Sequence, residues 1–379
     1  MKILHVSDCY LPRLGGIETQ VHDLARRQLD VGHDVEVVTA TPRARHDRTE
    51  REVIDGVPLL RTTVDLPFEL PVHPRAGREV RRVLRTARDS GRGYDAVHVH
   101  AGVVSPFAMG ALPAIVAERV PTVVTVHSLW GYATPAFRLL DACCGWSRWP
   151  VVFTAVSEVA AEPLRRLVGP AATVEVLPNG IDAAAWQVQA APRDPDDVVI
   201  VSVMRLAARK RPLPLLRMLR RVREAVPPRI RIQALVVGDG PQRPAMERLS
   251  ARHGMQGWVE LTGRVDRGQL RELYRRADLF VAPARLESFG IAALEARTAG
   301  VPVVAMARAG IREFVEPEVE GLLADGDRAM AAAVARLVVD APLRTAMAGH
   351  NRAVLPRMTW RSVLEQCDRA YARAGELVG

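Results

Sequence analysis

The sequence predicts an α/β protein with two domains, each built on a mainly parallel sheet, and three observations lead to this prediction. The chain has 379 residues, which is long for one domain and natural for two of similar size. Short apolar segments rich in β-branched residues alternate with longer segments of helical period. A stretch rich in Ala, Pro and Asp, residues 183–197, separates two such series. Strands that alternate with helices form βαβ units and therefore parallel sheets.

The first series of strands predicts a domain over residues 1–182. Val21, Leu24 and Leu29 have the spacing of a helix that follows the first strand and ends at Gly32. The predicted strands are 3–8, 34–40, 95–102, 121–127, 151–157 and 174–180.

The second series predicts a domain over residues 198–358, joined to the first by the linker 183–197. One more helix, at 359–379, closes the chain. The predicted strands are 198–204, 231–240, 258–264, 277–284 and 301–307.

The net charge of +9 first suggests a nucleic-acid or anionic-membrane partner. Among 52 basic residues, however, only Lys2 and Lys210 are lysines, a ratio typical of a compositional bias towards Arg. No RNA-recognition, zinc-finger or helix-turn-helix pattern accompanies the charge. We therefore expect no nucleic-acid partner.

Cysteine usage and hydropathy together predict a cytoplasmic protein. Cys143 and Cys144 are adjacent and no CxxC pair occurs, which indicates a reducing compartment and no zinc site. The apolar start of the chain is too short for a signal peptide. The uncharged stretches 101–117 and 120–137 contain Pro and polar residues, unlike a spanning helix of roughly 20 apolar residues.

The most informative pattern follows the fourth strand of the second series. Glu287 lies in the turn, and Ser288 is the expected N-cap of the next helix. Phe289, Gly290 and Ile291 form the expected first helical turn. Because the N–H groups of a first turn have no partner inside the helix, this position favours an anion such as phosphate.

Glu295 lies eight residues after Glu287, about 12 Å further along the helix axis at the usual rise per residue. This separation is wide for the carboxyl pair of a glycosidase, which lies roughly 5–9.5 Å apart. It suits one extended ligand, with a sugar at Glu287, a diphosphate at the start of the helix and a ribose at Glu295.

Two cations follow the first strand of the second series. Arg205 and Lys210 lie five residues apart in the loop after this strand. Positioned cations stabilise the charge that grows on a departing nucleoside diphosphate. A lysine in a chain that otherwise uses arginine indicates a need for a compact ammonium group at Lys210.

Two pairs of glycines follow strands in the two domains. Gly15 and Gly16 allow positive φ and close contact with a ligand after the first strand. Gly238 and Gly240 fit half of a dinucleotide-binding fingerprint, but Arg243 occupies the position of its third glycine. An oxidoreductase is therefore disfavoured.

Together these motifs resemble the family 4 glycosyltransferases, retaining enzymes of GT-B architecture in which two Rossmann-like domains face each other across a cleft. The resemblance covers nearly the whole chain and rests most on Glu287 and Glu295 within ESFGIAALEARTAGVPVV. Gly15-Gly16-Ile17-Glu18, VLPNGID and GDGPQR support it. The segment TWRSV, residues 359–363, resembles the family's closing helix, which crosses back to the first domain.

The resemblance implies a nucleotide-diphosphate sugar as donor and no metal or other cofactor. Arg205 and Lys210 would hold the diphosphate with the amides of Gly16, Gly290 and Ile291. The leaving phosphate itself would help to take the acceptor proton, so that no side-chain nucleophile is required. The implied donor site comprises Gly15, Gly16, Arg205, Lys210, Val265, Glu287, Ser288, Phe289, Gly290, Ile291 and Glu295.

The resemblance also assigns individual roles around the nucleoside and the sugar. Glu295 would bind the ribose and Glu287 the hydroxyls of the transferred hexose. Val265 would lie near the base, and His127 would face the sugar and the acceptor. Arg205, Lys210, Glu287 and His127 are thus the expected catalytic residues.

The chain departs from the family pattern at several glycines. Met204 and Arg211 occupy the usual glycines before the Arg and after the Lys, which could reshape the phosphate loop. Ala309 occupies the first glycine of a GGxxE segment, a smaller change.

Local motifs point to the acceptor. HSLWG, RLAARK and GDGPQR resemble the protein that places N-acetylglucosamine on phosphatidylinositol in GPI-anchor synthesis. They favour a UDP-sugar and an inositol-type or lipid-linked acceptor, while an actinobacterial natural-product or cell-envelope acceptor stays open. The alternative functions are a nucleotide-sugar epimerase and a non-catalytic nucleotide-sugar-binding subunit.

Three further features allow more than one interpretation. His98 and His100 share one face of a strand but lack a third metal ligand of suitable spacing, so we expect ordinary packing. The aromatic residues of segment 130–149 could form an acceptor wall, a membrane-facing patch or, as we expect, part of the core. The arginines of a basic helix could contact anionic lipid at the inner membrane face or simply cover a surface. They are Arg75, Arg78, Arg82 and Arg85.

Overall fold

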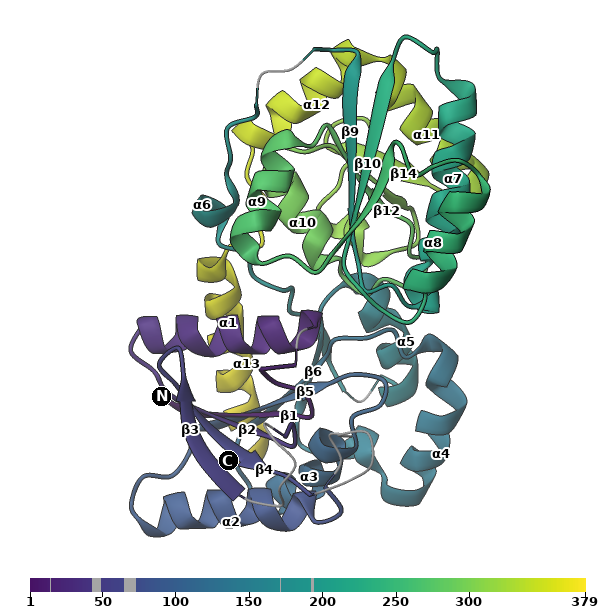
Figure 1. Cartoon of the computed structure of the whole chain (residues 1–379). Helices are drawn as coiled ribbons and strands as arrows, with labels where there is room; N and C mark the ends of the chain where they lie inside the picture. Colours follow the sequence, from purple (N-terminus) through teal and green to yellow (C-terminus); the bar gives the residue numbers. More distant parts are fainter. Residues whose placement is uncertain (14, 43–48, 65–72, 171, 192–193) are drawn as a thin grey trace. The chain divides into compact units, whose positions relative to one another are not determined.

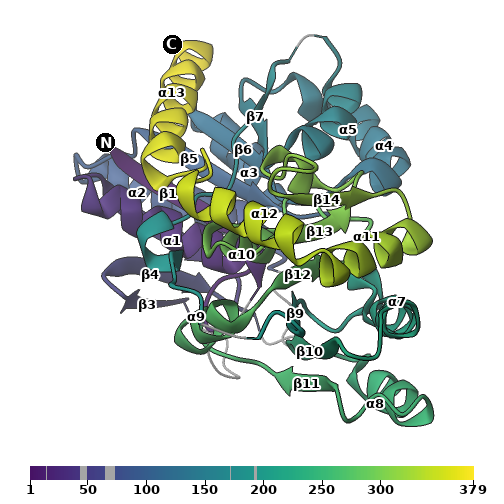
Figure 2. The same cartoon turned by 90° about the horizontal axis from the view of Figure 1, so that it is seen from above.

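The computed structural model describes residues 1–13, 15–42, 49–64, 73–170, 172–191 and 194–379. The chain divides into two compact units, whose elements are labelled in Figures 1 and 2. The first unit combines Met1–Gly180 with Trp360–Gly379, and the second is Ile181–Thr359. Each unit is an α/β domain with its own sheet, as the alternation of strands and helices predicted.

The first unit contains an eight-stranded sheet in the order β3-β4-β2-β1-β5-β6-β7-β8. Only β3 runs antiparallel to its neighbour within the described pairs. Its strands are β1 (Lys2–Ser7), β2 (Asp34–Thr39), β3 (Thr49–Ile54), β4 (Val57–Thr62), β5 (Ala96–Ala101), β6 (Thr122–Val126), β7 (Val152–Ala155) and β8 (Val174–Val176). Its α-helices are α1 (Gly16–Asp30), α2 (Ala76–Asp89), α3 (Pro106–Ala117), α4 (Thr134–Cys144), α5 (Glu158–Val168) and α13 (Trp360–Val378).

The second unit contains a six-stranded parallel sheet in the order β11-β10-β9-β12-β13-β14. Its strands are β9 (Asp197–Val203), β10 (Arg231–Val237), β11 (Val259–Gly263), β12 (Leu279–Ala282), β13 (Val303–Met306) and β14 (Gly321–Ala324). Its α-helices are α6 (Ala183–Trp186), α7 (Pro212–Ala225), α8 (Arg243–Arg252), α9 (Arg267–Arg276), α10 (Ile291–Thr298), α11 (Asp327–Val339) and α12 (Ala341–Ala353).

Both sheets have a topological switch point, where the strand order reverses direction. In the first sheet it lies between β1 and β5, and in the second between β9 and β12. Open parallel sheets bind ligands at the carboxyl ends of the two strands that flank such a point. The loops after β1, β5, β9 and β12 are therefore where a site is expected.

The closing helix α13 belongs to the first unit, as predicted. It packs against β5, β6, β7 and α1, and Figure 2 shows it beside these elements. Trp360, Cys367 and Tyr371 are buried in the same cluster as Ile3 of β1. Gly180 allows the contact at the start of the helix, since a Cβ there would lie 2.5 Å from the Trp360 ring.

Three parts of the fold differ from the sequence-based expectations. The β3–β4 hairpin was not predicted, although its turn, Asp55-Gly56, is a common hairpin sequence. The edge strand β14 was also not predicted. The described residues of the stretch 183–197, which was expected to be a linker, belong to the second unit. Trp186 of α6, for example, is buried 5.8 Å from the Tyr274 ring.

The aromatic segment of the first unit is mainly core. Trp130 stacks on Phe137 with ring centroids 3.9 Å apart, and Trp146 packs edge-on against both. The helix that carries Phe137, α4, nevertheless exposes Leu139 and Leu140. Among the described residues, none of the helices has the length and apolar character needed to cross a bilayer.

Helix α2 is the basic helix predicted from the arginine spacing. Val80 and Leu84 are buried, so one face packs on the core. On its other face, Arg85 and Arg88 donate to the carboxylate of Glu118 at 2.8 and 3.0 Å. Part of the positive charge is therefore balanced within the first unit.

Candidate functional site

The loop after β9 carries both cations that were predicted to hold phosphate. Arg205 is exposed, and Lys210 ends a short 3-10 turn, η4 (Ala208–Lys210). The loop then enters α7 at Pro212, a favourable first residue for a helix. Both cations thus lie at the carboxyl end of a strand that flanks the switch point of the second sheet.

The turn after β10 supports this loop from behind. The Leu206 amide donates to the Asp239 carbonyl at 2.9 Å. Gly238 and Gly240 have φ values of 123° and 157°, and a Cβ at Gly240 would lie 2.7 Å from the Leu206 carbonyl oxygen. A Cβ at Gly238 would collide with the Met204 carbonyl. These glycines are therefore explained by close packing of two loops, without a dinucleotide.

The turn after β12 ends at Gly290, which caps α10 with a φ of 96°. The helix begins at Ile291, so the prediction that Ser288 is its N-cap was wrong. Gly290 has a left-handed conformation, and a Cβ added to it would lie 2.5 Å from the Ile311 side chain. The turn therefore requires glycine at this position, and the helix begins only after it. The amides of Ile291 and Ala292 open the helix without intrahelical partners, as an anion site requires.

A second glycine fixes the main chain around Glu287. The amide of Gly310, in the 3-10 helix η5 (Gly310–Glu313), donates to the Glu287 carbonyl at 2.9 Å. A Cβ on Gly310 would collide with the Ser288 carbonyl. The replacement of the preceding family glycine by Ala309 leaves this contact intact.

The structure brings the two predicted motifs together through one ion pair. Nζ of Lys210 lies 2.5 Å from Oε2 of Glu287, and the side chains are 24% and 16% exposed. Charges that are partly withdrawn from water interact more strongly than exposed ones. Lys210 and Glu287 therefore form a fixed, half-buried pair between the loop after β9 and the start of α10.

Arg211 occupies the position after Lys210 at which the family usually has a glycine. Its φ of 62° is left-handed, the conformation that explains a glycine at this position. The guanidinium donates to both carboxylate oxygens of Asp327 at 2.9 and 2.7 Å, and to the Pro283 carbonyl at 3.1 Å. The hydrogen bonds from Arg211 hold the pKa of Asp327 below its usual range. Arg211 thus ties the loop after β9 to the loop after β12.

The other predicted donor residues of the second unit differ in accessibility. Phe289 is buried against Phe314, with ring centroids 5.4 Å apart, so only its main chain is available to a ligand. Glu295 is half-buried on α10, and its charge adds to burial in raising the pKa of Tyr274. Val265 follows β11 and is half-buried. A separate hollow of about 390 Å³ lies along β11, away from both cations.

In the first unit, Gly15 and Gly16 lie at the start of α1. Gly15 is the N-cap, and its φ of −169° is ordinary extended backbone, so it does not use the positive φ that a glycine allows. A side chain at Gly15 would instead collide with the carboxylate of Glu18, which folds back over the helix start. A side chain at position 15 would therefore displace the Glu18 carboxylate from the helix start.

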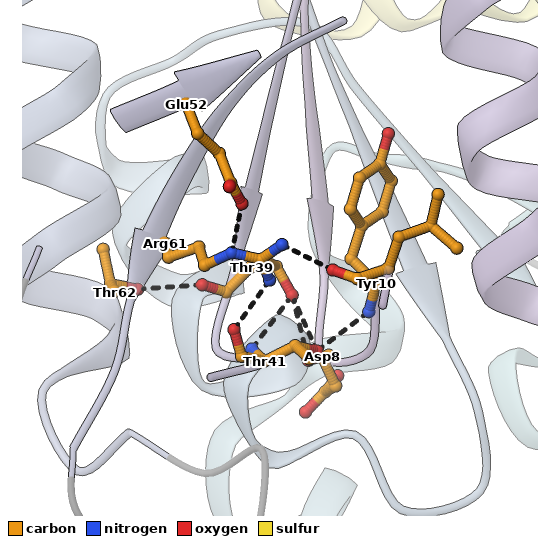
Figure 3. A network of polar contacts seen from close by, with 8 residues as sticks. Asp8, Tyr10, Thr39, Thr41, Glu52, Arg61 and Thr62 are labelled. Atoms are coloured by element: carbon orange, nitrogen blue, oxygen red, sulfur yellow. Dashed lines mark hydrogen bonds and ion pairs between the residues drawn. The ribbon is translucent and has the colours of Figure 1, made fainter. Parts of the chain in front are cut away.

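A buried network positions the loop that leads to these glycines, as Figure 3 shows. The Arg61 guanidinium contacts Glu52 and donates to the carbonyls of Thr41 at 2.9 Å and Leu11 at 2.5 Å. The carboxylate of Asp8 accepts from the Phe107 amide at the start of α3 at 2.7 Å. The chain that leaves β1 is thus held on both sides.

His127 follows β6 and is joined to a group of buried histidines. Its Nε2 lies 3.0 Å from Nδ1 of His100. His5, His98 and His100 offer nitrogens within 4.8 Å of one another, so the third imidazole that the sequence analysis lacked is His5. The alternation on β5 revealed His98 and His100, but only the parallel register of β1 with β5 brings His5 beside them.

Hydrogen bonds account for the nitrogens of this group. Both nitrogens of His5, His98 and His100 already lie 2.6–3.0 Å from a hydrogen-bonding partner within the described residues. A metal ion would have to break several of these bonds. Burial lowers the pKa of His5 and of His127 to about 4, which keeps both rings neutral at pH 7.

Comparison with known families identifies both halves of the chain. Residues 14–185 match a family model described as Glycosyltransferase Family 4, and residues 187–354 match one described as Glycosyl transferases group 1.

Two curated relatives match along nearly the whole chain. A D-inositol 3-phosphate glycosyltransferase of Xylanimonas cellulosilytica is 30% identical, covering 95% of this chain and 92% of that protein. One subunit of the phosphatidylinositol N-acetylglucosaminyltransferase of Arabidopsis thaliana is 26% identical, covering 99% of this chain and 82% of that protein.

Solved structures share the fold. A crystal structure of HepE from Anabaena, in complex with UDP and glucose, has a TM-score of 0.74 at 20% identity, covering 98% of this chain and 99% of that one. A sucrose-phosphate synthase from Thermosynechococcus elongatus has the same TM-score of 0.74 at 21% identity, covering 98% of each chain.

Proposed function

The chain belongs to glycosyltransferase family 4, and on that premise we propose that it is a retaining enzyme of the cytoplasm that uses a UDP-sugar. The transferred group is a hexose or an N-acetylhexosamine, and the acceptor is inositol-type, lipid-linked or a natural product. The names of the relatives support an inositol-type acceptor, since two of them act on inositol phosphate or phosphatidylinositol.

The observation that carries the proposal is the pairing of Lys210 with Glu287 at the switch point of the second sheet. It places an ammonium group next to a helix whose first amides favour an anion. A carboxylate alongside them suits the hydroxyls of a sugar. One extended ligand with a phosphate and a sugar matches these three features.

The chemistry follows from where charge develops during transfer. The bond between the anomeric carbon and the phosphate oxygen breaks, a bond to the acceptor oxygen forms, and the acceptor proton goes to the leaving phosphate. Negative charge on the diphosphate therefore grows towards the transition state. Lys210, Arg205 and the amide of Ile291 stabilise this charge more in the transition state than in the ground state.

The remaining roles complete the proposed site. Glu287 accepts hydrogen bonds from the sugar and Glu295 from the ribose, while Val265 contacts the base. In the first unit, the Gly16 amide donates a hydrogen bond to the phosphate, and His127 contacts a sugar hydroxyl. No metal takes part in this scheme, because the cations and the helix start neutralise the diphosphate.

A donor panel tests the proposal. The full chain is titrated by calorimetry with UDP, GDP and ADP, and then incubated with the corresponding sugars without an acceptor. We expect UDP to bind most tightly, and slow release of UDP and free sugar from one UDP-sugar. Interconversion of donors would indicate an epimerase, and binding without turnover a non-catalytic subunit.

The acceptor is tested in the same assay. Inositol phosphate and vesicles containing phosphatidylinositol are added with the donor that is hydrolysed, and the anomeric configuration of the product is read by NMR. An α-linked product from an α-linked donor is expected for a retaining enzyme. A β-linked product would contradict retention.

A further inference from the structure

A hydrogen-bonded chain runs through the core of the first unit and ends at His127. Oε1 of Gln28, on α1, lies 2.6 Å from Nε2 of His5. Nδ1 of His5 lies 2.9 Å from Nε2 of His100, and Nδ1 of His100 lies 3.0 Å from Nε2 of His127. Four side chains from α1, β1, β5 and the end of β6 are thus joined in series.

A side branch starts from the same glutamine but does not lead to His127. Nε2 of Gln28 donates to the Tyr371 hydroxyl of α13 at 2.9 Å. This hydroxyl lies 2.8 Å from Nδ1 of His98, whose Nε2 lies 2.6 Å from the Thr125 hydroxyl. Thr125 in turn lies 2.6 Å from the Thr154 hydroxyl. Gln28 is therefore the branch point of the network.

Neutral imidazoles give the chain a direction. A neutral ring donates from one nitrogen and accepts at the other, and a carbonyl oxygen can only accept. Burial lowers the pKa of His100 well below its usual value and that of His5 to about 4, so both are neutral at pH 7. In the amide orientation that places Oε1 of Gln28 towards His5 and its Nε2 towards Tyr371, Nε2 of His5 donates and its Nδ1 accepts.

The same rule carries the direction outwards to the last ring. His100 donates from Nε2 to His5 and accepts at Nδ1, so the proton between His100 and His127 belongs to Nε2 of His127. In a neutral His127, Nδ1 then carries a lone pair and no hydrogen. A ring nitrogen in this state can accept a hydrogen bond but cannot donate one.

The buried rings themselves cannot hold the substrate. His5, His98 and His100 have at most 2% of their surface exposed. The cavity beside His98, His100 and His127 measures about 20 Å³, which is room for about one water molecule and not for a sugar. Only His127, which is half-buried at the end of β6, can contact a ligand.

We propose that Gln28, acting through His5 and His100, is a positioning residue that fixes the tautomer of His127 with its proton on Nε2, so that Nδ1 acts only as a hydrogen-bond acceptor. The effect on donor turnover rests on the proposed function, whereas the tautomer does not. Partners behind a metal-binding imidazole fix its tautomer and orientation, and their loss typically costs about 10- to 100-fold in affinity or activity. For His127 we expect a loss at the lower end of this range.

The tautomer is measured on the full chain without any nucleotide sugar. Two-dimensional NMR of protein labelled with ¹⁵N-histidine reports which ring nitrogen carries the proton, with His127 assigned from a His127→Gln variant. We expect Nε2 of His127 to be protonated and Nδ1 unprotonated. A proton on Nδ1 in the unmutated protein would overturn the proposal, and this outcome does not depend on any variant folding.

A matched pair of variants tests the role of Gln28. Gln28→Met removes the branch point with little change in volume, and Thr154→Val alters the end of the side branch. We expect Gln28→Met to give a mixture of His127 tautomers and about a tenfold loss of donor turnover, and Thr154→Val to preserve both. Unchanged spectra and turnover in a folded Gln28→Met protein would overturn the proposal.

Added zinc distinguishes a hydrogen-bonded group of histidines from a metal site. The spectrum is recorded after chelator treatment and again with added zinc. We expect the His5, His98 and His100 signals to stay unchanged. A shift of all three signals with zinc would assign them to a metal site and remove the tautomer relay. Failure of the UDP titration alone would count against the proposed function and leave the relay standing.

Discussion

The two units have the same kind of switch point but fill it with opposite chemistry. In the first unit, His5 and His98 on the flanking strands are fully buried, neutral and hydrogen-bonded to other side chains. In the second, the loops after the flanking strands present an ammonium, a carboxylate and helix amides that are only partly buried. The comparison teaches that topology selects the place, while the side chains decide whether it is buried and neutral or partly exposed and charged.

The largest effect is expected at Lys210, which carries the ammonium group at the switch point of the second unit. Lys210→Met keeps most of the stem and deletes the charge, so turnover should fall about 10²–10³-fold, or about 2.7–4 kcal/mol in the barrier. Single-turnover rates at saturating donor measure this. Lys210→Arg should recover part of the rate, and Arg209→Met, an exposed neighbour, should be normal. A Met variant within about threefold of the parent would contradict the role.

Acidification should lower the stability of the first unit, whose switch point is occupied by neutral histidines. Burial lowers the pKa of His5 from 6.5 to about 4, so the unfolded chain binds more protons in this window. The contribution of His5 to stability is therefore complete above about pH 6.5 and lost as the pH falls through about 4, by about 3 kcal/mol in all.

Urea unfolding at several pH values tests this prediction. A His5→Gln variant should show a flatter pH dependence than the parent, and His253→Gln, which alters an exposed histidine of the second unit, should not. Equal slopes for the parent and His5→Gln would show that His5 is not held neutral.

A smaller effect is expected for Glu295. A variant at this position tests binding in the ground state, whereas variants at Lys210 test stabilisation of the transition state. If the Glu295 carboxylate accepts hydrogen bonds from the ribose, Glu295→Ala should weaken UDP alone by about tenfold to a hundredfold, since such a bond contributes roughly 1.5–3 kcal/mol. Calorimetry measures the affinity, with Glu272→Ala on the exposed face of α9 as control. Unchanged UDP affinity would remove Glu295 from the site.

The smallest effect concerns the periphery of the first unit. If α2 contacts the inner membrane face, exchanging Arg78, Arg82 and Arg85 for Glu should abolish sedimentation with anionic vesicles and leave donor hydrolysis intact. Each Arg near such a surface contributes about 1 kcal/mol. Because Arg85 is already paired with Glu118, we expect weak binding even at low salt. If the unmutated protein never sediments with the vesicles, contact between α2 and the membrane is excluded.

Local patterns predicted most of the fold and the charged half of the site. Strand and helix periods are set by neighbouring residues, so both sheets and the closing helix could be recognised. Lys210 and Glu287 each had a local context, the end of a strand and the start of a helix. Their contact could not be predicted, because it depends on β9 and β12 being neighbours in the sheet.

The parts that sequence reasoning missed depend on contacts between distant segments. His5 lies 93 and 95 positions before His98 and His100, and only the strand register joins them. Gly238 and Gly240 fit half of a dinucleotide-binding fingerprint in the sequence. Their packing against Met204 and Leu206 could not be predicted, because these residues belong to another loop.

The central claim is that the charged switch point of the second unit binds the diphosphate of a nucleotide sugar. Hydrogen–deuterium exchange of the full chain with and without UDP tests it most directly. The account predicts slower exchange in the loop 205–211 and at the amides of Gly290 and Ile291, and no change along the hollow beside β11 at residues 256–261. Protection at residues 256–261 with none at 205–211 or Gly290 would contradict it.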